Sequence, residues 1–158
     1  MLAGIDKVIA DDVQLIWQTG KYYYKGVIER LGPNIHPNVR VLEFLNKMDL
    51  AYAAADLIIS RAGAGTIAEL CLIKKPVILV PSPNVAEDHQ TKNALALVKN
   101  DAALLINDRS AEDILVAEAL KLLENTARCK VLSENIGKMA LQDADIMIAK
   151  EVLKLVKS

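Results

Sequence analysis

The segment 56–70, DLIISRAGAGTIAEL, combines residue types suited to binding a phosphorylated ligand. Its apolar run predicts a short buried strand, and the residues from Thr66 onward are good helix formers. Gly63 and Gly65 lie between the two, where glycine lets the backbone turn and approach a ligand closely. Because free N–H groups at the start of a helix attract phosphate, this junction predicts a phosphate site.

Glu69 lies one turn inside the predicted helix, where its carboxylate can point back over the end of the strand. There it can accept hydrogen bonds from vicinal hydroxyls such as those of a ribose, and phosphate plus ribose suggests a nucleotide. Two alternatives stay open. Thr66 and Glu69 also fit a capping box that serves only the helix start, and Gly63 and Gly65 also fit a tight turn without a ligand.

Two carboxamides, Gln90 and Asn93, are three residues apart on a helix predicted over 88–99. They continue the buried stripe that includes Ala94 and Leu97 instead of joining the charged face. Since carboxamides both donate and accept hydrogen bonds, this placement indicates directional contacts of the kind that sugar hydroxyls make. Taken alone, each would more often be a surface amide.

The other residues able to do chemistry have plainer interpretations. Arg61 follows the predicted strand and either faces a ligand or pairs with a nearby carboxylate. His36 and His89 have no Cys or acidic cluster at ligand spacing, which favours noncatalytic roles. Asp143 and Asp145 resemble the paired acids of metal-dependent sugar transferases, but they fit better in the first turn of a helix. The sequence therefore predicts no metal site.

Short β-rich runs alternate with amphipathic helices, the pattern of a parallel sheet covered by helices on both faces. We therefore expect an α/β fold. The predicted strands cover 13–17, 39–44, 56–60, 77–80 and 102–106. The predicted helices cover 2–10, 23–31, 48–54, 66–73, 88–99 and 111–123, followed by two C-terminal helices within about 127–157.

Ligands bind beyond the carboxyl ends of the strands in open α/β sheets. The polar residues of interest follow strand ends, so we expect one rim to gather the segments 18–20, 45–48, 61–69, 81–93 and the loop after Ile106. The part of that rim with sequence PSPNVAED, 81–88, holds two prolines that limit its freedom and help fix the start of the next helix.

Length and composition bound the class of protein. The 158 residues support a single domain, 1–158, able to bury roughly 70% of its unfolded surface. A net charge of −1 gives no electrostatic reason to expect nucleic acid or an anionic membrane as partner. Cys71 and Cys129 lack metal-ligand spacing and are expected to be reduced thiols. No apolar run approaches the ~20 residues of a membrane span and no signal peptide is evident, so we expect a cytoplasmic protein.

Several longer motifs resemble those of a known protein family. The run ADLIISRAGAGTIAEL, followed by KKPVILVPSP and DHQTKNA, closely resembles the C-terminal donor-binding domain of the MurG family of bacterial peptidoglycan glycosyltransferases. WQTGK at 17–21 and FLNKMDLAYAAAD at 44–56 match the same family. The resemblance implies a Rossmann-like parallel sheet that forms the C-terminal half of a GT-B glycosyltransferase. Such enzymes transfer N-acetylglucosamine from UDP-N-acetylglucosamine to lipid I, forming lipid II with inversion, and they use no metal or other cofactor.

The resemblance also implies roles for individual residues. Glu69 would hold the ribose hydroxyls, and Gln90 and Asn93 would hold the sugar hydroxyls. The backbone near Leu45, with Met48 close by, would recognise uracil. The donor site would therefore draw on three separate parts of the chain.

The donor's diphosphate and sugar would lie against the turn 61–65 and the helix behind it, where Ala64 offers a backbone N–H. The matching positions of this turn are Arg61, Gly63, Ala64 and Gly65. Gln18 and Gly20 match a family loop on the same rim. Backbone N–H groups and a helix start that stabilise the departing diphosphate could take the place of a metal ion.

The chain departs from the family pattern in two ways. The N-terminal acceptor domain is missing, and with it the histidine expected as general base, so the resemblance assigns no catalytic residue here. The GGSxGA phosphate loop and its strand, expected just before the opening helix, are missing as well. We therefore interpret the chain as a fragment, inactive by itself, whose sheet has an exposed edge that invites self-association. Two alternatives stay open: the donor-binding subunit of a split glycosyltransferase, and a nonenzymatic nucleotide-sugar-binding module.

Overall fold

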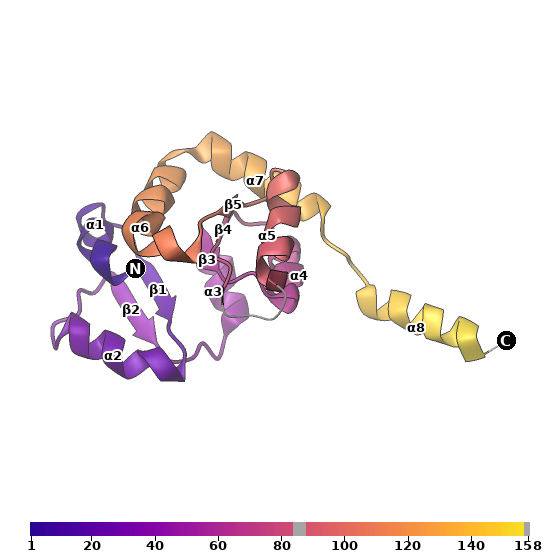
Figure 1. Ribbon diagram of the computed structural model, residues 1–158, viewed down its shortest axis with the longest axis horizontal. Coiled ribbons are helices and arrows are strands. Elements are labelled where there is room, and N and C mark those ends of the chain that lie inside the picture. The colour runs from indigo at the N-terminus through magenta and orange to yellow at the C-terminus, as the bar shows by residue number, and fades with distance from the viewer. Residues whose placement is uncertain (84–87, 157–158) are drawn as a thin grey trace.

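The computed structural model describes residues 1–83 and 88–156, which form an α/β fold whose strand pairings are all parallel (Figure 1). The strands in these residues are β1 (Leu15–Gln18), β2 (Val39–Leu42), β3 (Ile58–Ser60), β4 (Val77–Leu79) and β5 (Leu104–Leu105). The helices are η1 (Leu2–Gly4, a 3-10 helix), α1 (Ile5–Ala10), α2 (Lys21–Leu31), α3 (Met48–Ala54), α4 (Ala64–Ile73), α5 (His89–Lys99), α6 (Asp108–Glu124), α7 (Thr126–Lys138) and α8 (Ala144–Val156). Part of the predicted loop 81–88 and the end of the predicted helical region 127–157 lie outside the described residues.

Each predicted strand and helix is present, although the strands are shorter than predicted. β1 begins at Leu15 because its first hydrogen bond across the sheet runs from the Leu15 N–H to the Asn38 carbonyl. β3 likewise begins where the Ile58 N–H donates to the Pro76 carbonyl. The apolar runs of the sequence extend beyond these residues, because a residue can be buried without pairing with a neighbouring strand.

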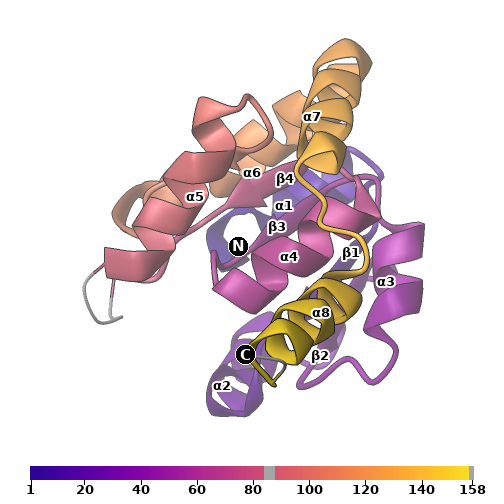
Figure 2. The ribbon, with the colours of Figure 1, turned by 90° about the vertical axis from the view of Figure 1, so that its right-hand side faces the viewer.

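The strands form two separate hydrogen-bonded sheets, not the single sheet that the sequence predicted. β1 pairs with β2, and the other sheet has the order β3-β4-β5. Figures 1 and 2 both place β1 on the side of its sheet that is nearer β3. Apolar patterning could not have revealed this break, because it identifies strands without identifying their neighbours.

Helices cover both faces of the second sheet, as predicted. The side chains of Val77, Ile78 and Leu79 in β4 are completely buried. Because successive side chains of a strand point to opposite faces, Val77 and Leu79 pack with residues of α4 and α5, whereas Ile78 packs with residues of α6. In α7, Ile136 belongs to the cluster of Val77 and Leu79, and Leu132 belongs to the cluster of Ile78. The carboxyl ends of these strands are therefore held firmly.

The opening helices contact the cores of both sheets. Met1 packs in the cluster of Ile78 and α6, which also includes Ile59 of β3. Ile5 belongs to the separate cluster formed by the first sheet and α2. Gly4 faces α6 so closely that a Cβ added there would lie 2.5 Å from Val116 Cβ. The start of the chain thus lies where the two sheets come together (Figure 1).

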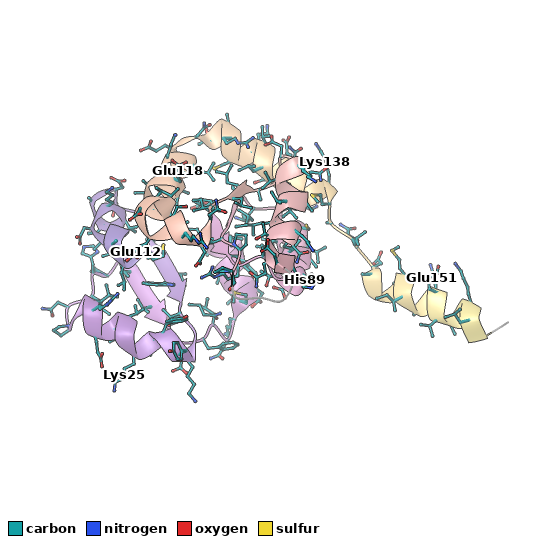
Figure 3. All side chains as sticks on the ribbon, in the orientation of Figure 1. Lys25, His89, Glu112, Glu118, Lys138 and Glu151 are labelled. Atoms are coloured by element: carbon teal, nitrogen blue, oxygen red, sulfur yellow. The ribbon has the colours of Figure 1, made fainter. Side chains whose placement is uncertain are left out.

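The last helix, α8, extends away from the rest of the molecule, and Figure 3 places its Glu151 far from Glu112 and Glu118 of α6. Its large apolar side chains are exposed, among them Ile148 at 65% and Leu155 at 78%. None of the helices in the described residues is both long enough and apolar enough to cross a membrane.

Candidate functional site

The loop that follows β2 is fastened to the carboxyl end of β1. The Leu45 N–H donates a 2.8 Å hydrogen bond to Gln18 Oε1, and the Gly20 N–H donates to the Glu43 carbonyl at 3.1 Å. Gly20 has a φ of +75°, a conformation that favours glycine, so its own backbone accounts for the residue type. Three predicted site residues, Gln18, Gly20 and Leu45, are therefore neighbours.

Glu69 meets α3 across the rim. Tyr52 Oη donates to Glu69 Oε2 at 3.4 Å, and Met48 begins the same helix one turn earlier. The pKa of Tyr52 is raised, first by burial of the phenol and then by the Glu69 carboxylate and its hydrogen bond. The Glu69 side chain is exposed, so its carboxylate stays open to a ligand while Tyr52 orients it.

The capping-box interpretation of Glu69 is wrong. α4 begins at Ala64, two residues before the predicted start, and its N-cap is Gly63, which has no side chain. Glu69 is consequently the sixth residue of the helix, whereas a capping box pairs an N-cap Ser or Thr with the third. The carboxylate has no role at the helix start and is left for contacts across the rim.

The tight-turn interpretation of Gly63 and Gly65 is also wrong. Gly63 is extended, with φ −66° and ψ 146°, and Gly65 lies inside α4, so neither adopts a conformation reserved for glycine. A Cβ added at Gly65 would meet no described atom within 4 Å, and one at Gly63 would meet only Thr66 Oγ1, at 3.7 Å. A glycine inside a helix costs about 0.5–1 kcal/mol relative to alanine. The chain's own packing therefore gives no reason for either glycine.

The start of α4 is open to an anion. The N–H groups of Ala64, Gly65 and Thr66 make no hydrogen bond within the described part of the chain, and no side chain caps the helix. The first turn also contains no acidic residue. The partial positive charge of a helix N-terminus is thus uncompensated at the place where the two glycines leave room.

Gln90 and Asn93 both hold the loop between β3 and α4, so the surface-amide interpretation is wrong. Gln90 Oε1 accepts hydrogen bonds from the Ala62 N–H at 3.2 Å and the Ser82 N–H at 2.9 Å. Asn93 Nδ2 donates to the Ala62 carbonyl at 3.1 Å. These bonds fix the orientation of both amides. Gln90 Nε2, a donor, and Asn93 Oδ1, an acceptor, have no partner among the described residues and are free for a ligand.

Arg61 pairs with a carboxylate, as one of the two interpretations of this residue predicted. Its Nη1 forms an ion pair with Asp108 at the start of α6. The same nitrogen donates to the carbonyls of Val80 at 3.1 Å and Pro81 at 3.4 Å. Arg61 thus ties the end of β3 to the segments that follow β4 and β5. Its contact with a ligand stays a prediction.

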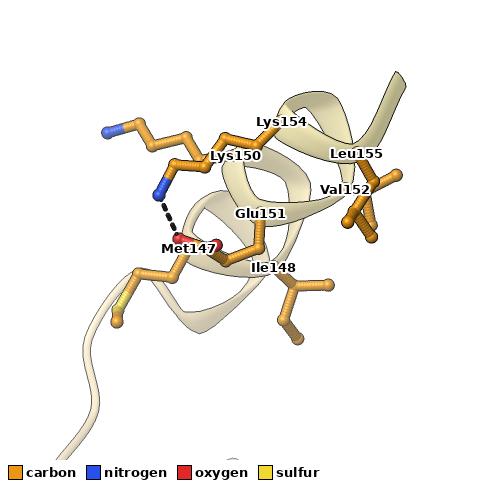
Figure 4. A pocket seen from close by; sticks show the side chains of 7 residues that line it. All are labelled: Met147, Ile148, Lys150, Glu151, Val152, Lys154 and Leu155. Carbon is orange, nitrogen blue, oxygen red and sulfur yellow. Dashed lines mark hydrogen bonds and ion pairs between the residues drawn. The ribbon is translucent and has the colours of Figure 1, made fainter. Parts of the chain in front are cut away.

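An open hollow of about 430 Å³ lies at the carboxyl ends of β4 and β5. It is lined by Pro81, Pro83, Asp88, Thr91, Asn107, Asp108, Arg109 and Ser110. Asp108 lines the hollow and also pairs with Arg61, which joins the third, fourth and fifth predicted rim segments. A hollow of about 480 Å³ on α8 is lined by that helix alone, where Lys154 pairs with Glu151, and it contains no predicted site residue (Figure 4).

The contacts of three residues of this rim escaped the sequence analysis: those of Tyr52, Ala62 and Asp108. Tyr52 follows Met48 by four residues on one helix, a spacing that could have drawn attention to it. Ala62 acts through its backbone and Asp108 through a partner 47 positions away, and neither leaves a signal in the sequence. Within residues 1–83 and 88–156, no three His, Cys, Asp or Glu side chains gather as a metal site would require.

The C-terminal domain of glycosyltransferase family 28 matches residues 3–150. The chain belongs to this family. It is 55% identical over 149 residues to a Bacteroides thetaiotaomicron protein, covering 94% of this chain and 40% of that one. A Bacteroides fragilis protein is 54% identical over 157 residues, with 98% and 41% covered. Both relatives are named UDP-N-acetylglucosamine--N-acetylmuramyl-(pentapeptide) pyrophosphoryl-undecaprenol N-acetylglucosamine transferase.

Solved structures agree with the family assignment. The crystal structure of Acinetobacter baumannii MurG matches with a TM-score of 0.79 and 26% identity, covering 97% of this chain and 44% of that one. The glycosyltransferase VinC in complex with dTDP matches with a TM-score of 0.66 at 19% identity, over 87% of this chain and 32% of that one, and shows the fold alone. The resemblance to the C-terminal half of MurG is thus confirmed. The chain spans about two fifths of the length of the curated relatives it matches.

Proposed function

We propose that this family 28 domain binds UDP-N-acetylglucosamine as the donor-binding part of an N-acetylglucosaminyltransferase. The observation that carries the proposal is the uncapped start of α4, where Gly63 and Gly65 leave three backbone N–H groups open although the fold requires neither glycine. The names of the curated relatives support N-acetylglucosamine as the sugar of the donor. The dTDP complex of VinC supports a nucleoside diphosphate as the ligand class of this fold.

The nucleoside would lie over the first sheet. Glu69 accepts hydrogen bonds from the ribose hydroxyls while Tyr52 holds one of its oxygens. The Leu45 N–H is already bonded to Gln18, so the Leu45 carbonyl is the group left to accept the N3–H of uracil. Met48, on the helix that carries Tyr52, packs against the base.

The diphosphate and sugar would lie over the second sheet. The N–H groups at the start of α4 bind the diphosphate. Gln90 Nε2 donates to one sugar hydroxyl, and Asn93 Oδ1 accepts from another. Because the opposite ends of these two amides hold Ala62, the sugar contacts and the phosphate-binding loop would be positioned together.

The proposed reaction transfers N-acetylglucosamine to lipid I with inversion, at the cytoplasmic face of the bacterial membrane and without a cofactor. A lipid I hydroxyl attacks the anomeric carbon, and the bond from that carbon to the diphosphate breaks with its electron pair leaving on UDP. The hydroxyl proton passes to a general base in the part of the relatives that this chain does not span. The start of α4 stabilises the charge that develops on UDP.

Calorimetric titration of the chain with UDP-N-acetylglucosamine and UDP-glucose tests the proposal. Saturable binding that prefers the N-acetylglucosamine donor is expected. Glu69→Ala should weaken binding by about 1.5–3 kcal/mol, or roughly 10- to 150-fold, through loss of charge-assisted hydrogen bonds. A folded chain that binds neither nucleotide sugar would contradict donor binding by this part alone. Binding without transfer, after the missing part of a relative is supplied, would favour a nonenzymatic module.

Self-association through an unpaired sheet edge, expected from the sequence, stays a prediction. Sedimentation of the chain over a range of concentrations tests it directly.

A further inference from the structure

The three residues that follow β4 are held through their backbone from two sides. The carbonyls of Val80 and Pro81 accept hydrogen bonds from Arg61 Nη1, at 3.1 and 3.4 Å. The next N–H group, that of Ser82, donates to Gln90 Oε1 at 2.9 Å. The Pro81 carbonyl and the Ser82 N–H belong to one planar peptide group. Arg61 and Gln90 therefore hold the two ends of the same peptide.

The same two residues also meet on the segment that follows β3. Gln90 Oε1 accepts a second hydrogen bond, from the Ala62 N–H at 3.2 Å. Ala62 comes directly after Arg61, so this N–H belongs to the peptide that joins them. A closed ring of contacts thus runs from the Arg61 side chain through the peptide after Pro81 to Gln90, and back to the Arg61 backbone.

Asp108 gives this ring a charged partner. It is the first residue of α6, and its carboxylate pairs with Arg61 Nη1. The Arg61 side chain is 56% exposed, and fixing so long a side chain costs rotamer entropy. A hydrogen bond to a carboxylate offsets this cost better than one to a neutral carbonyl. An acidic residue also suits the first turn of a helix, but that role requires no contact with Arg61.

We propose that Asp108 is a positioning residue for recognition of the donor sugar, acting through Arg61 on the amide of Gln90. The inference rests on the proposed function, in which Gln90 Nε2 donates to a sugar hydroxyl. The N–H groups of Ala62 and Ser82 both bind Oε1 and so direct Nε2 away from the loop. Without Asp108, Arg61 is no longer fixed on the peptide after Pro81, and the amide loses its orientation.

Calorimetric titration with UDP and UDP-N-acetylglucosamine tests the proposal on two variants. Asp108→Ala removes the partner of Arg61 and should reduce the preference for UDP-N-acetylglucosamine over UDP by roughly 2- to 10-fold, the contribution of one hydrogen bond. Asp108→Asn removes the same charge but keeps an oxygen that can accept from Arg61, so it should retain most of the preference. The comparison separates the contact from the change in charge near the diphosphate.

A double-mutant cycle shows whether Asp108 acts through Gln90. Gln90→Glu keeps an oxygen for the Ala62 and Ser82 N–H groups but has no Nε2 donor. In that background, Asp108→Ala should leave the nucleotide preference unchanged, because the contact that Asp108 positions is already lost. An effect of Asp108 on the fold alone would instead add to the effect of Gln90→Glu.

Amide hydrogen exchange measured by NMR gives a second readout, without nucleotide. In Asp108→Ala, the Ser82 amide should exchange roughly 2- to 10-fold faster, because the peptide that it shares with Pro81 is held less firmly. The Val80 amide donates to the Ser60 carbonyl at 2.8 Å and is the control for general destabilisation. Its exchange should change little.

Unchanged exchange of the Ser82 amide in Asp108→Ala would overturn the proposal. Equal weakening of UDP and UDP-N-acetylglucosamine would overturn it as well, because Arg61 would then act on the diphosphate directly. The two proposals can also fail separately. If the unaltered chain binds neither nucleotide, the proposed function fails and the positioning role fails with it. If the chain binds both and Asp108→Ala keeps the preference, only the positioning role fails.

Discussion

Tyr52 and Glu69 join two helices that follow different sheets, with Tyr52 Oη 3.4 Å from Glu69 Oε2. α3 leaves the first sheet after β2, whereas α4 follows β3 of the second. The hydrogen bond therefore orients Glu69, the residue proposed to bind the ribose, from the other side of the break between the two sheets. It also gives Glu69 a partner that its place in the sequence did not indicate.

The Tyr52 phenol should report on this contact through its pKa. Burial and the nearby carboxylate raise that pKa, so Glu69→Gln should lower it toward the ordinary value of about 10. A pKa raised by folding means that the associated stability is present below about pH 10 and is lost as the pH rises through the folded value. Tyrosinate absorbance during an alkaline titration measures the shift. Tyr52→Phe identifies its signal among the four tyrosines, and an unchanged pKa in Glu69→Gln would show that burial alone acts.

Gly65→Ala should stabilise the fold and weaken nucleotide binding. A Cβ there meets no described atom, so the helix should gain about 0.5–1 kcal/mol of unfolding free energy. The added methyl group would crowd a diphosphate at the start of α4 by about 1–3 kcal/mol, a loss of roughly 5- to 150-fold in affinity. Urea unfolding and UDP titration measure the two effects. Gly26→Ala in α2, also in open space, should stabilise without affecting binding, and equal binding by both variants would contradict the site.

Two acidic substitutions separate the ligand-facing and loop-holding ends of the amides. Gln90→Glu keeps an oxygen for the Ala62 and Ser82 N–H groups but removes the free Nε2 donor. It should preserve stability while reducing the preference for UDP-N-acetylglucosamine over UDP by roughly 2- to 10-fold. Asn93→Asp removes the donor to the Ala62 carbonyl and should destabilise the fold by about 1–3 kcal/mol.

Both substitutions add one negative charge near the diphosphate, so Asn93→Asp is the control that shows how far this charge alone changes the ratio of the two nucleotide affinities. Calorimetry gives the ratio and thermal unfolding gives the stability. If Gln90→Glu left the preference unchanged, Gln90 would act on the loop alone.

Gly4→Ala should destabilise the chain through a clash between η1 and α6. The new Cβ would lie 2.5 Å from Val116 Cβ, and overpacking of this kind costs about 1–3 kcal/mol. Val116→Ala removes two of the atoms within 3 Å of that Cβ but not Val116 Cβ itself, so it should relieve the clash only in part. A double-mutant cycle in urea should therefore give a favourable coupling energy between the two positions. Strictly additive effects would mean that η1 moves freely over α6.

The strand and helix positions could be predicted because their cause is local. Apolar runs such as the one before Arg61 mark buried strands, and the amphipathic stripe of α5 marks its buried face. The start of α4 was misplaced by two residues, since Gly63 as N-cap carries no side chain to signal it. Because of this error, the sequence alone did not exclude a capping box at Thr66 and Glu69. The observed start of α4 excludes it.

The sequence by itself determined the α/β class, the rim on which the candidate residues lie and the likeness to the family, because each depends on residue types at short spacing. Only the tertiary structure decided that Gln90 and Asn93 share Ala62, that Arg61 meets Asp108 and that the sheet is split beside β1. These features join residues that are 28, 31 and 47 positions apart, or depend on which strand lies next to which. Such pairings are set by how the packed elements meet in space, and a single sequence carries no local pattern for them.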